Sequence, residues 1–255
     1  MQPYLLAPHV FPCVSGQHVV LMDLERDKYV AVAPAHRLAG RVRGWPVGAA
    51  QASGSDNPER EADRLVSQML AHGMLVTDPH LGKPALPVTI ARPERALIEF
   101  DLDARPRAGT AHLLRFARSC LRAQLSLKLS PLQSIVQTVG ERKARAALSS
   151  ARECGSAPGN GPAAMDGQWH GPTADARPLV TAFTRLRPLF YTLRAACLLD
   201  SLTLLHFLSA DGICPDWVFG VKTEPFDAHC WVQQGEVLFN DVPDRVRQYS
   251  PILVV

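Results

Sequence analysis

The stretch that decides the fold runs from Trp217 to Asn240 and reads WVFGVKTEPFDAHCWVQQGEVLFN. It divides into three runs of β-branched and aromatic residues separated by short polar segments containing Gly or Pro, a pattern typical of consecutive antiparallel strands. The predicted strands cover Trp217 to Lys222, Ala228 to Gln233 and Glu236 to Asn240. The C-terminal part of the chain is therefore expected to contain an antiparallel sheet.

Two polar residues in this stretch can meet across neighbouring strands. Strand alternation places His229 and Trp231 on the same face. A three-residue connection, 234–236, pairs His229 with Asp241, whose carboxylate could then orient the imidazole. A two-residue turn pairs His229 with Asn240 instead, and an amide can also orient a catalytic histidine. Both registers remain open at this point.

A thiol precedes these strands in an apolar helical pattern. Cys197 lies in the run LRAACLLDSL, at or near the predicted start of a helix, where the helix dipole lowers the pKa of a thiol. If the helix instead begins at Val180, this dipole argument fails. A nucleophilic thiol needs a base within hydrogen-bond reach and a third group that orients the base, and His229 and Asp241 follow in that order. Each residue taken alone is more typical of a structural role.

Helical patterns precede the sheet. Between Ala104 and Ala147, basic side chains far outnumber acidic ones and alternate with apolar residues at helical spacing. This predicts an amphipathic helix pair with a solvated basic face, with a docking surface for an acidic partner as the alternative. Residues 148–178 are rich in Gly and Pro and are expected to form a mobile insertion. A helical layer with a terminal sheet makes 110–255 an α+β domain.

The first 80 residues predict a small winged-helix-like module that suits binding better than chemistry. Residues 17–33 form two β-prone runs around a charged turn, which indicates a hairpin. Helices are expected over Ala35 to Arg43 and from the N-cap Asn57 to about His72. A short strand is expected at Met74 to Val76.

A proline-rich linker, residues 81–109, follows this module and contains at most one strand, Ala96 to Phe100. The whole-chain charge of +3 is too small to indicate a nucleic-acid partner. The six cysteines form no CxxC pair, which favours free thiols over a disulfide framework or a metal site. The first residues do not form a signal sequence and no stretch is long enough to span a membrane, so a cytoplasmic location is expected.

The C-terminal motifs resemble a known family. The run Cys197 to Leu202, the run Phe219 to Val221, the run Pro225 to Val232 and the pair Asn240-Asp241 are similar to the lasso-peptide biosynthesis B protein. The resemblance covers about Pro178 to Val242. It implies a transglutaminase-like, papain-related cysteine peptidase domain with a Cys-His-Asp triad.

Within that resemblance each triad residue has a role. Cys197 is the nucleophile, His229 is the general base and then the acid, and Asp241 orients His229. One departure is Cys230, where the family commonly has alanine. Because strand alternation turns Cys230 away from His229, we expect it to have little consequence.

The N-terminal 80 residues resemble the PqqD-like peptide-recognition element of the same family. In such elements the leader peptide adds as an extra strand to the sheet edge and is clamped by the last helix. The expected leader contacts are Tyr29, Val30, Val32, Leu65 and Met69. For the last two, packing in the core is at least as strongly expected.

The resemblance implies a cysteine endopeptidase that removes the leader from a lasso-type ribosomal peptide precursor, so that the core peptide can be cyclised. The implied partners are the precursor, through its leader, and a macrolactam-forming, asparagine-synthetase-like cyclase. ATP would belong to the cyclase, and no cofactor is expected here because the chain lacks a GxxxxGK[ST] motif. The alternatives are a transglutaminase-like or N-acyltransferase enzyme on the same triad, and a non-catalytic leader-binding adaptor for the cyclase.

Overall fold

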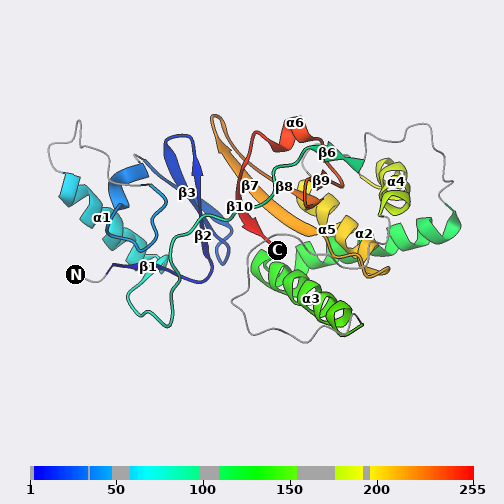
Figure 1. The fold of residues 1–255 in the computed structure, drawn as a ribbon, viewed down its shortest axis with the longest axis horizontal. Helices are drawn as coiled ribbons and strands as arrows, with labels where there is room; N and C mark the ends of the chain where they lie inside the picture. Colours follow the sequence, from blue (N-terminus) through cyan, green and yellow to red (C-terminus); the bar gives the residue numbers. More distant parts are fainter. Residues whose placement is uncertain (1–2, 34, 48–57, 98–108, 154–175, 192–195) are drawn as a thin grey trace. The chain divides into compact units, whose positions relative to one another are not determined.

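The structure, a computed structural model, describes residues 3–33, 35–47, 58–97, 109–153, 176–191 and 196–255 (Figure 1). The chain divides into two compact units. The first unit extends to Thr89 and also includes Gly220–Ala228 and Tyr249–Leu253, and the second contains the rest. The first unit is therefore assembled from segments that lie far apart in the sequence.

The sheet of the first unit has three antiparallel strands in the order β2 (Val10–Ser15), β3 (His18–Asp23) and β4 (Lys28–Val32). Strands β3 and β4 form the hairpin expected within residues 17–33, whereas β2 was not predicted. Strand β1 (Leu5–Leu6) pairs separately with β5 (Leu75–Val76), which lies in the expected strand at Met74 to Val76.

The helix of the first unit, α1 (Pro58–Ala71), closely matches the expected span and buries Ala62, Val66 and Met69 on one face. The expected N-cap Asn57 lies outside the described residues. The helix expected over Ala35 to Arg43 is wrong, because only the short 3-10 turn η1 (Ala35–Leu38) forms. Gly40 then adopts a positive φ of 74°, and Val42 forms a bridge with Tyr4, for which the backbone must leave the helical conformation.

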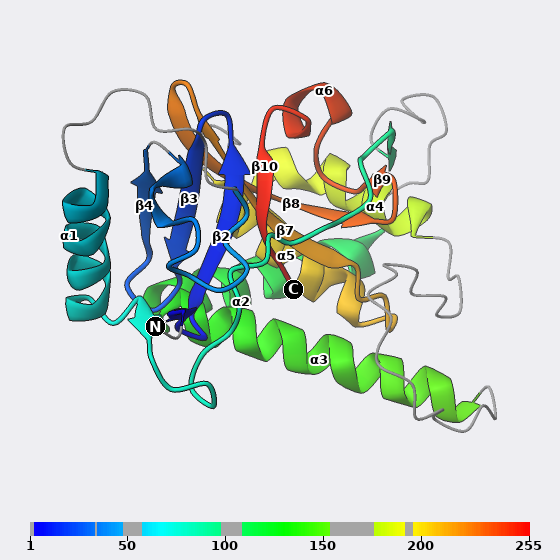
Figure 2. The same cartoon turned by 60° about the vertical axis from the view of Figure 1, so that its left-hand side comes forward.

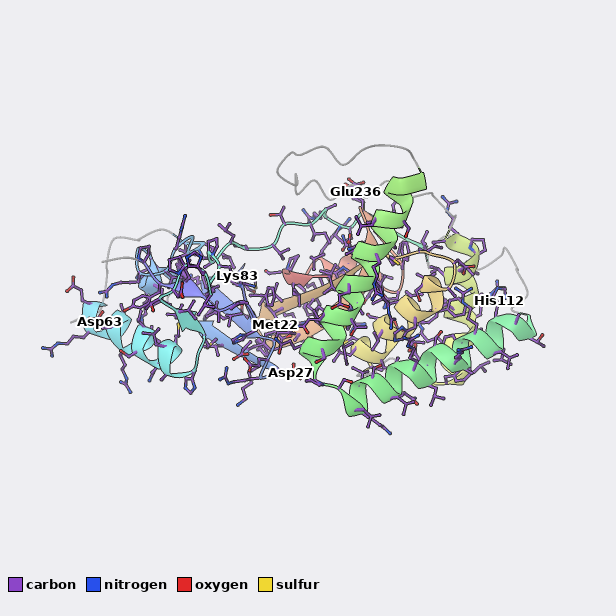
Figure 3. The ribbon with its side chains drawn as sticks, turned by 90° about the horizontal axis from the view of Figure 1, so that it is seen from below. Met22, Asp27, Asp63, Lys83, His112 and Glu236 are labelled. Atoms are coloured by element: carbon purple, nitrogen blue, oxygen red, sulfur yellow. The ribbon has the colours of Figure 1, made fainter. Side chains whose placement is uncertain are left out.

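The second unit contains most of the helices. Its first two are α2 (Thr110–Leu129) and α3 (Leu132–Glu153), which confirm the expected helix pair and run apart from the short connection between them (Figure 3). The others are α4 (Arg177–Leu186), the 3-10 turn η3 (Arg187–Leu189), α5 (Cys197–Ser209) and α6 (Pro243–Val246). None of the helices in the described parts of the chain is both long enough and apolar enough to cross a membrane.

Both ends of the expected insertion 148–178 are helical. Helix α3 continues to Glu153 and α4 begins at Arg177, while 154–175 lies outside the described residues. The helices share an aromatic core: Phe116 of α2, Phe183 of α4 and Phe207 of α5 are fully buried. The ring of Phe183 lies 5.0 Å from Phe116 and 5.8 Å from Phe207. This cluster fixes α5 against its neighbours.

The longest sheet has five strands in the order β10 (Ser250–Val254), β7 (Asp216–Thr223), β8 (Phe226–Gln234), β9 (Val237–Leu238) and β6 (Arg95–Ala96) (Figure 2). Strand β10 was not predicted. Strand β6 begins one residue before the expected strand Ala96 to Phe100, whose last three residues lie outside the described parts. Because β6 pairs with β9 in parallel, the sheet is mixed rather than purely antiparallel.

Both registers proposed for the β8–β9 hairpin are wrong. Gln234 pairs with Val237 and Gln233 with Leu238, so the connection has two residues, Gly235 and Glu236. Gly235 has a φ of 57°, the positive value that two-residue hairpin turns require and that glycine adopts without strain. Strand β9 ends at Leu238, two residues before the expected end at Asn240, and the chain bends over the next residues.

Candidate active site

Cys197 is the first residue of α5, with Ala196 as the N-cap. Helix α4 ends at Leu186, so α5 is a separate helix that does not begin at Val180. The first backbone N–H groups of a helix have no partner within the helix and carry the positive end of its dipole. Cys197 therefore lies at the N-terminus of its helix, where the helix dipole can lower the pKa of its thiol.

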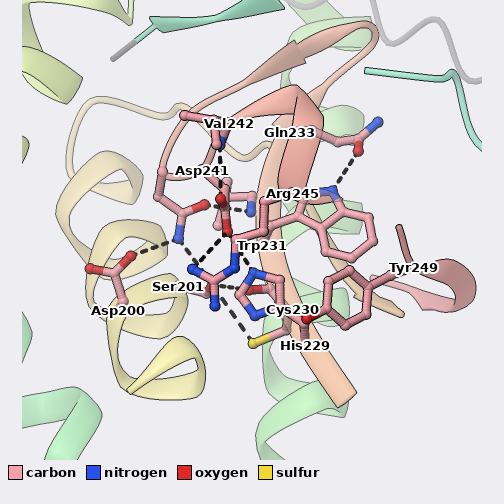
Figure 4. A network of polar contacts seen from close by, with 12 residues as sticks. Asp200, Ser201, His229, Cys230, Trp231, Gln233, Asp241, Val242, Arg245 and Tyr249 are labelled. Carbon is pink, nitrogen blue, oxygen red and sulfur yellow. Dashed lines mark hydrogen bonds and ion pairs between the residues drawn. The ribbon is translucent and has the colours of Figure 1, made fainter. Parts of the chain in front are cut away.

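His229 and Asp241 lie in direct contact. The Nε2 atom of His229 is 2.5 Å from Oδ2 of Asp241, and both side chains are buried (Figure 4). The other carboxylate oxygen accepts the backbone N–H of Val242 at 2.8 Å. The guanidinium of Arg245 lies 3.9 Å from Oδ2. These contacts hold the carboxylate against one edge of the imidazole.

The bend after β9, and not pairing along the strands, brings Asp241 to His229. In the observed register Gln233 is opposite Leu238, and the bend covers residues 239–241. The expected contact between His229 and Asp241 is thus present, but the strand register from which it was predicted is wrong. The alternative partner, Asn240, does not orient His229 and has a separate set of hydrogen bonds.

The ring of His229 connects Asp241 to Cys197. Because Nε2 faces Asp241, Nδ1 is left for the hydrogen bond with Cys197. Burial alone would lower the pKa of His229, but the hydrogen bonds to Asp241 and Cys197 outweigh it and raise the pKa to about 9. The imidazole therefore stays protonated in neutral solution.

Cys197 has the opposite shift. The hydrogen bond from the side chain of Cys230 is the largest cause, and with those from His229 and the Cys230 backbone it outweighs burial and lowers the pKa of Cys197 to about 4. Between about pH 4 and 9 the pair is a thiolate and an imidazolium. This is the reactive form of a nucleophilic thiol.

Cys230 belongs to this site, contrary to the expectation that it has little consequence. Its thiol is fully buried, and burial raises its pKa well above the usual value, so it stays protonated and can donate. Its sulfur lies 3.8 Å from Oγ of Ser201, which is one helical turn after Cys197 on α5. Alternation does place His229 and Trp231 on one face, with ring centroids 6.1 Å apart. Cys230 lies on the other face of β8, close to the start of α5.

A buried polar network lies behind the thiol and was missed by the sequence analysis. Asn240 donates to Oδ2 of Asp200 at 2.8 Å and to Oγ of Ser201 at 3.2 Å, and it accepts the backbone N–H of Val232 at 2.8 Å. Asp200 also accepts the hydroxyl of Tyr191 and lies 3.4 Å from Arg187. Asn240 therefore links the β8–β9 region to α5 and fixes where Cys197 lies. The only sequence signal was that an aspartate interrupts an apolar helix.

Trp231 has a comparable positioning role. Its indole N–H donates to Oε1 of Gln233 at 2.6 Å (Figure 4). The amide of Gln233 in turn donates to the backbone oxygens of Ala91 and Gly235. This chain of hydrogen bonds fixes the indole that stacks on His229.

The five residues expected to contact a leader are not equally accessible. The side chains of Val32 and Met69 are buried, with 2% and 4% of their surface exposed. Leu65 is partly buried and packs against the same core. Val30 is 38% exposed on β4, an edge strand of its sheet, and Tyr29 packs on Phe226 at 5.7 Å. Packing thus accounts for the two helix residues, and Val30 offers the most accessible apolar surface of the five.

The fold and the site agree with a comparison against protein families. A family model described as the transglutaminase-like superfamily matches residues 117–254, which is more than half of the chain and includes Cys197, His229 and Asp241. The chain belongs to the transglutaminase-like superfamily. This superfamily includes cysteine peptidases and acyltransferases. Comparisons with curated proteins and with solved structures found no match.

Proposed function

We propose that this protein is a cysteine peptidase that binds a lasso-type ribosomal peptide precursor and removes its leader, with Cys197, His229 and Asp241 as the catalytic triad. The observation that carries the proposal is the hydrogen-bonded line from Asp241 through His229 to a thiol whose pKa is lowered to about 4. A structural cysteine gains nothing from such a shift, whereas a nucleophile needs it.

In the first step the Cys197 thiolate attacks the carbonyl carbon of the last leader residue. The negative charge moves to the carbonyl oxygen, for which the backbone N–H of Cys197, the first residue of α5, is the natural donor. The tetrahedral intermediate then collapses, and the carbon–nitrogen bond breaks. His229 gives its Nδ1 proton to the leaving nitrogen, which becomes the α-amine of the core peptide.

In the second step water resolves the leader thioester. The neutral His229 accepts a proton from the water, whose oxygen attacks the thioester carbon. The carbon–sulfur bond then breaks and returns Cys197 to the thiolate, and the leader leaves as a carboxylic acid that loses its proton to solvent. Asp241 holds the ring in the orientation that both proton transfers require and stabilises the imidazolium. The enzyme returns to the thiolate–imidazolium pair.

The substrate class comes from the resemblance of the C-terminal motifs to the lasso-peptide B protein. The edge strand β4 in the first unit supports a leader-binding role, because an extended peptide can add to a free sheet edge. Holding the leader raises the effective concentration of the scissile bond at Cys197. The freed α-amine would pass to an ATP-dependent, asparagine-synthetase-like cyclase.

A transglutaminase-like acyl transfer on the same triad is the second candidate, because the superfamily includes acyltransferases as well as peptidases. In that reaction an amine, and not water, resolves the thioester. The two reactions differ in the acyl product: hydrolysis gives a free leader acid, whereas transfer gives a leader amide of different mass.

The test is incubation of the purified protein with the precursor encoded beside its gene, with and without the cyclase and ATP, followed by intact masses. Wild-type protein should release the leader acid, and Cys197→Ala should not. Cys214→Ala is the matched control, because Cys214 is also a partly exposed free thiol of the second unit and should leave cleavage unchanged. Equal processing by wild type and Cys197→Ala would favour a non-catalytic leader-binding adaptor.

A further inference from the structure

Helix α2 has apolar side chains on two opposite faces. The buried residues of the helix are Phe116, Ser119, Cys120 and Ala123. The ring of Phe116 packs on that of Phe207, so this face lies against α5. On the other face, Leu114, Leu121 and Leu125 are 72%, 56% and 46% exposed, and Figure 3 shows side chains projecting from α2 on the side away from α5. A helix that is apolar on both faces is typical of one that is covered on both.

The three exposed leucines form one stripe along the helix, which we call the leucine stripe. Leu121 lies seven residues after Leu114, and Leu125 lies four residues after Leu121. Residues at this spacing line up on one side of an α-helix and form the seam through which two helices pack in a coiled coil. Arg118, one turn after Leu114, lies in the same line, and a polar residue in such a seam restricts which helices can pair with it.

The charged side chains on this face of α2 are all positive. The helix contains no aspartate or glutamate. Arg118 in the leucine stripe, and Arg122 and Lys128 beside it, are all exposed. Among the residues that the structure describes, none of these three forms an ion pair, whereas Arg115, nearer the packed face, pairs with Asp211.

These charges decide between two kinds of occupant for the leucine stripe. A second copy of this chain docked through the same face would bring the cations of both helices together, because a two-fold interface matches a patch with itself. Like charges across an interface oppose association. A helix with acidic side chains beside its own apolar stripe would instead pair with these cations while it covers the leucines.

We propose that the leucine stripe of α2 docks an amphipathic helix of a partner protein, whose apolar side chains are flanked by aspartate or glutamate. Removing the exposed leucines from water supplies affinity, and Arg118, Arg122 and Lys128 select an acidic partner. For α2, the exposed leucines thus favour the docking surface over a purely solvated basic face. This docking does not rest on the proposed peptidase activity, because α2 carries no residue of the proposed triad.

The test uses two fluorescein-labelled helical peptides that share one leucine stripe, which is flanked by glutamates in the first and by lysines in the second. Fluorescence anisotropy measures their binding to the full chain. The glutamate peptide should bind saturably. The lysine peptide should bind at least about tenfold more weakly, because its charges repel those of α2.

Matched variants show whether binding occurs at the leucine stripe. Leu121→Ser should weaken binding of the glutamate peptide about tenfold or more, because a leucine that becomes buried contributes at least that much. Leu148→Ser removes a leucine of α3 that is 64% exposed and should leave binding unchanged. The double variant Arg118→Glu and Arg122→Glu should reverse the preference, so that the lysine peptide binds more tightly. All these positions are exposed, so the variants should fold.

Three binding results would overturn the proposal: no saturable binding of the glutamate peptide, equal binding of the two peptides, or equal weakening by Leu121→Ser and Leu148→Ser. Sedimentation velocity of the chain alone tests the other occupant. Self-association that Leu121→Ser abolishes would also overturn the proposal, because a second copy would then cover the leucine stripe.

Discussion

Cys197 owes much of its lowered pKa to a second cysteine. The side chain of Cys230, together with the imidazole of His229, lowers the pKa of the Cys197 thiol. A hydrogen bond to a charged group is worth roughly 1.5–3 kcal/mol, and one pKa unit corresponds to about 1.4 kcal/mol. Cys230 therefore acts as a positioning and tuning residue for the nucleophile.

Replacing Cys230 by alanine should raise the pKa of Cys197 by about one unit, because the thiolate loses its favourable contact with the Cys230 side chain. The pH dependence of the alkylation rate of Cys197 by iodoacetamide measures this pKa directly. Cys13→Ala removes another buried thiol, in the first unit, and should leave the pKa unchanged. An unchanged alkylation profile in Cys230→Ala would show that the thiol contact has no influence.

The pH dependence of cleavage should follow the two groups of the ion pair. Activity requires the Cys197 thiolate, so it should rise through about pH 4, and it requires the His229 imidazolium, so it should fall through about pH 9. Asp241 raises the pKa of His229, so Asp241→Ala should move the alkaline limb to lower pH. A profile whose alkaline limb is the same in Asp241→Ala would contradict this role.

At the residue scale, the order of one thiol, one histidine and one aspartate was visible in the sequence. The contribution of Cys230 was not, because it depends on the start of α5 lying against one face of β8. Strand alternation describes which face a side chain takes, but it does not say what covers that face. The Asp200–Asn240 contact was hidden for the same reason, since its two members are 40 positions apart.

At the element scale, the link between Asn240 and α5 determines where Cys197, the proposed nucleophile, lies. Helix α5 begins at Cys197, and the hydrogen bonds of Asn240 to Asp200 and Ser201 attach its first turns to the bend after β9. The same bend places Asp241 at His229. One short segment therefore positions both Cys197 and Asp241, the two ends of the proposed triad.

Asn240→Ala should lower the free energy of unfolding by about 3 kcal/mol, because it leaves buried groups on Asp200, Ser201 and Val232 without a partner. Urea unfolding of the two proteins measures the difference. Gln124→Ala, at an exposed position of α2, should change stability by less than about 0.5 kcal/mol. Equal midpoints and slopes for Asn240→Ala and wild type would mean that the network does not stabilise the fold.

The type of most elements followed from hydrophobic periodicity, while their lengths and registers did not. The glycine in the Gly235-Glu236 turn allows a two-residue connection, yet the sequence Gln234-Gly235-Glu236 is equally compatible with three. Strand β10 has no polar alternation, because every residue after Ser250 is apolar, so the sequence pattern did not identify it.

At the scale of the whole molecule, the proposal assigns leader binding to the first unit and chemistry to the second. Two exposed valines allow a matched test, since Val30 on β4 and Val14 on β2 are both 38% exposed and lie on opposite edge strands of one sheet. Only the β4 edge is the proposed leader site.

Val30→Glu should raise the KM for the precursor about tenfold or more with little change in kcat, because a charge on the strand edge opposes the binding of an extended peptide. Steady-state cleavage of the full precursor gives both constants. Val14→Glu should leave both constants unchanged. If the two variants behave alike, the β4 edge is not the leader site.

The family membership of the second half could be anticipated from short motifs, whereas the make-up of the two units could not. Segments Gly220–Ala228 and Tyr249–Leu253 belong to the first unit although in the sequence they lie between parts of the second. Chain order suggested a simple boundary near residue 80, because sequence patterns report on neighbours along the chain and not on contacts across it.

The most direct measurement of the central claim is the site of alkylation at acidic pH. With six cysteines in the chain and the pKa of Cys197 at about 4, brief treatment with iodoacetamide at pH 5.5 should place a single label on the peptide that contains Cys197. The label should be lost in His229→Ala. Absence of reaction at pH 5.5, or equal labelling of Cys197 and Cys214, would contradict a thiolate nucleophile at the start of α5.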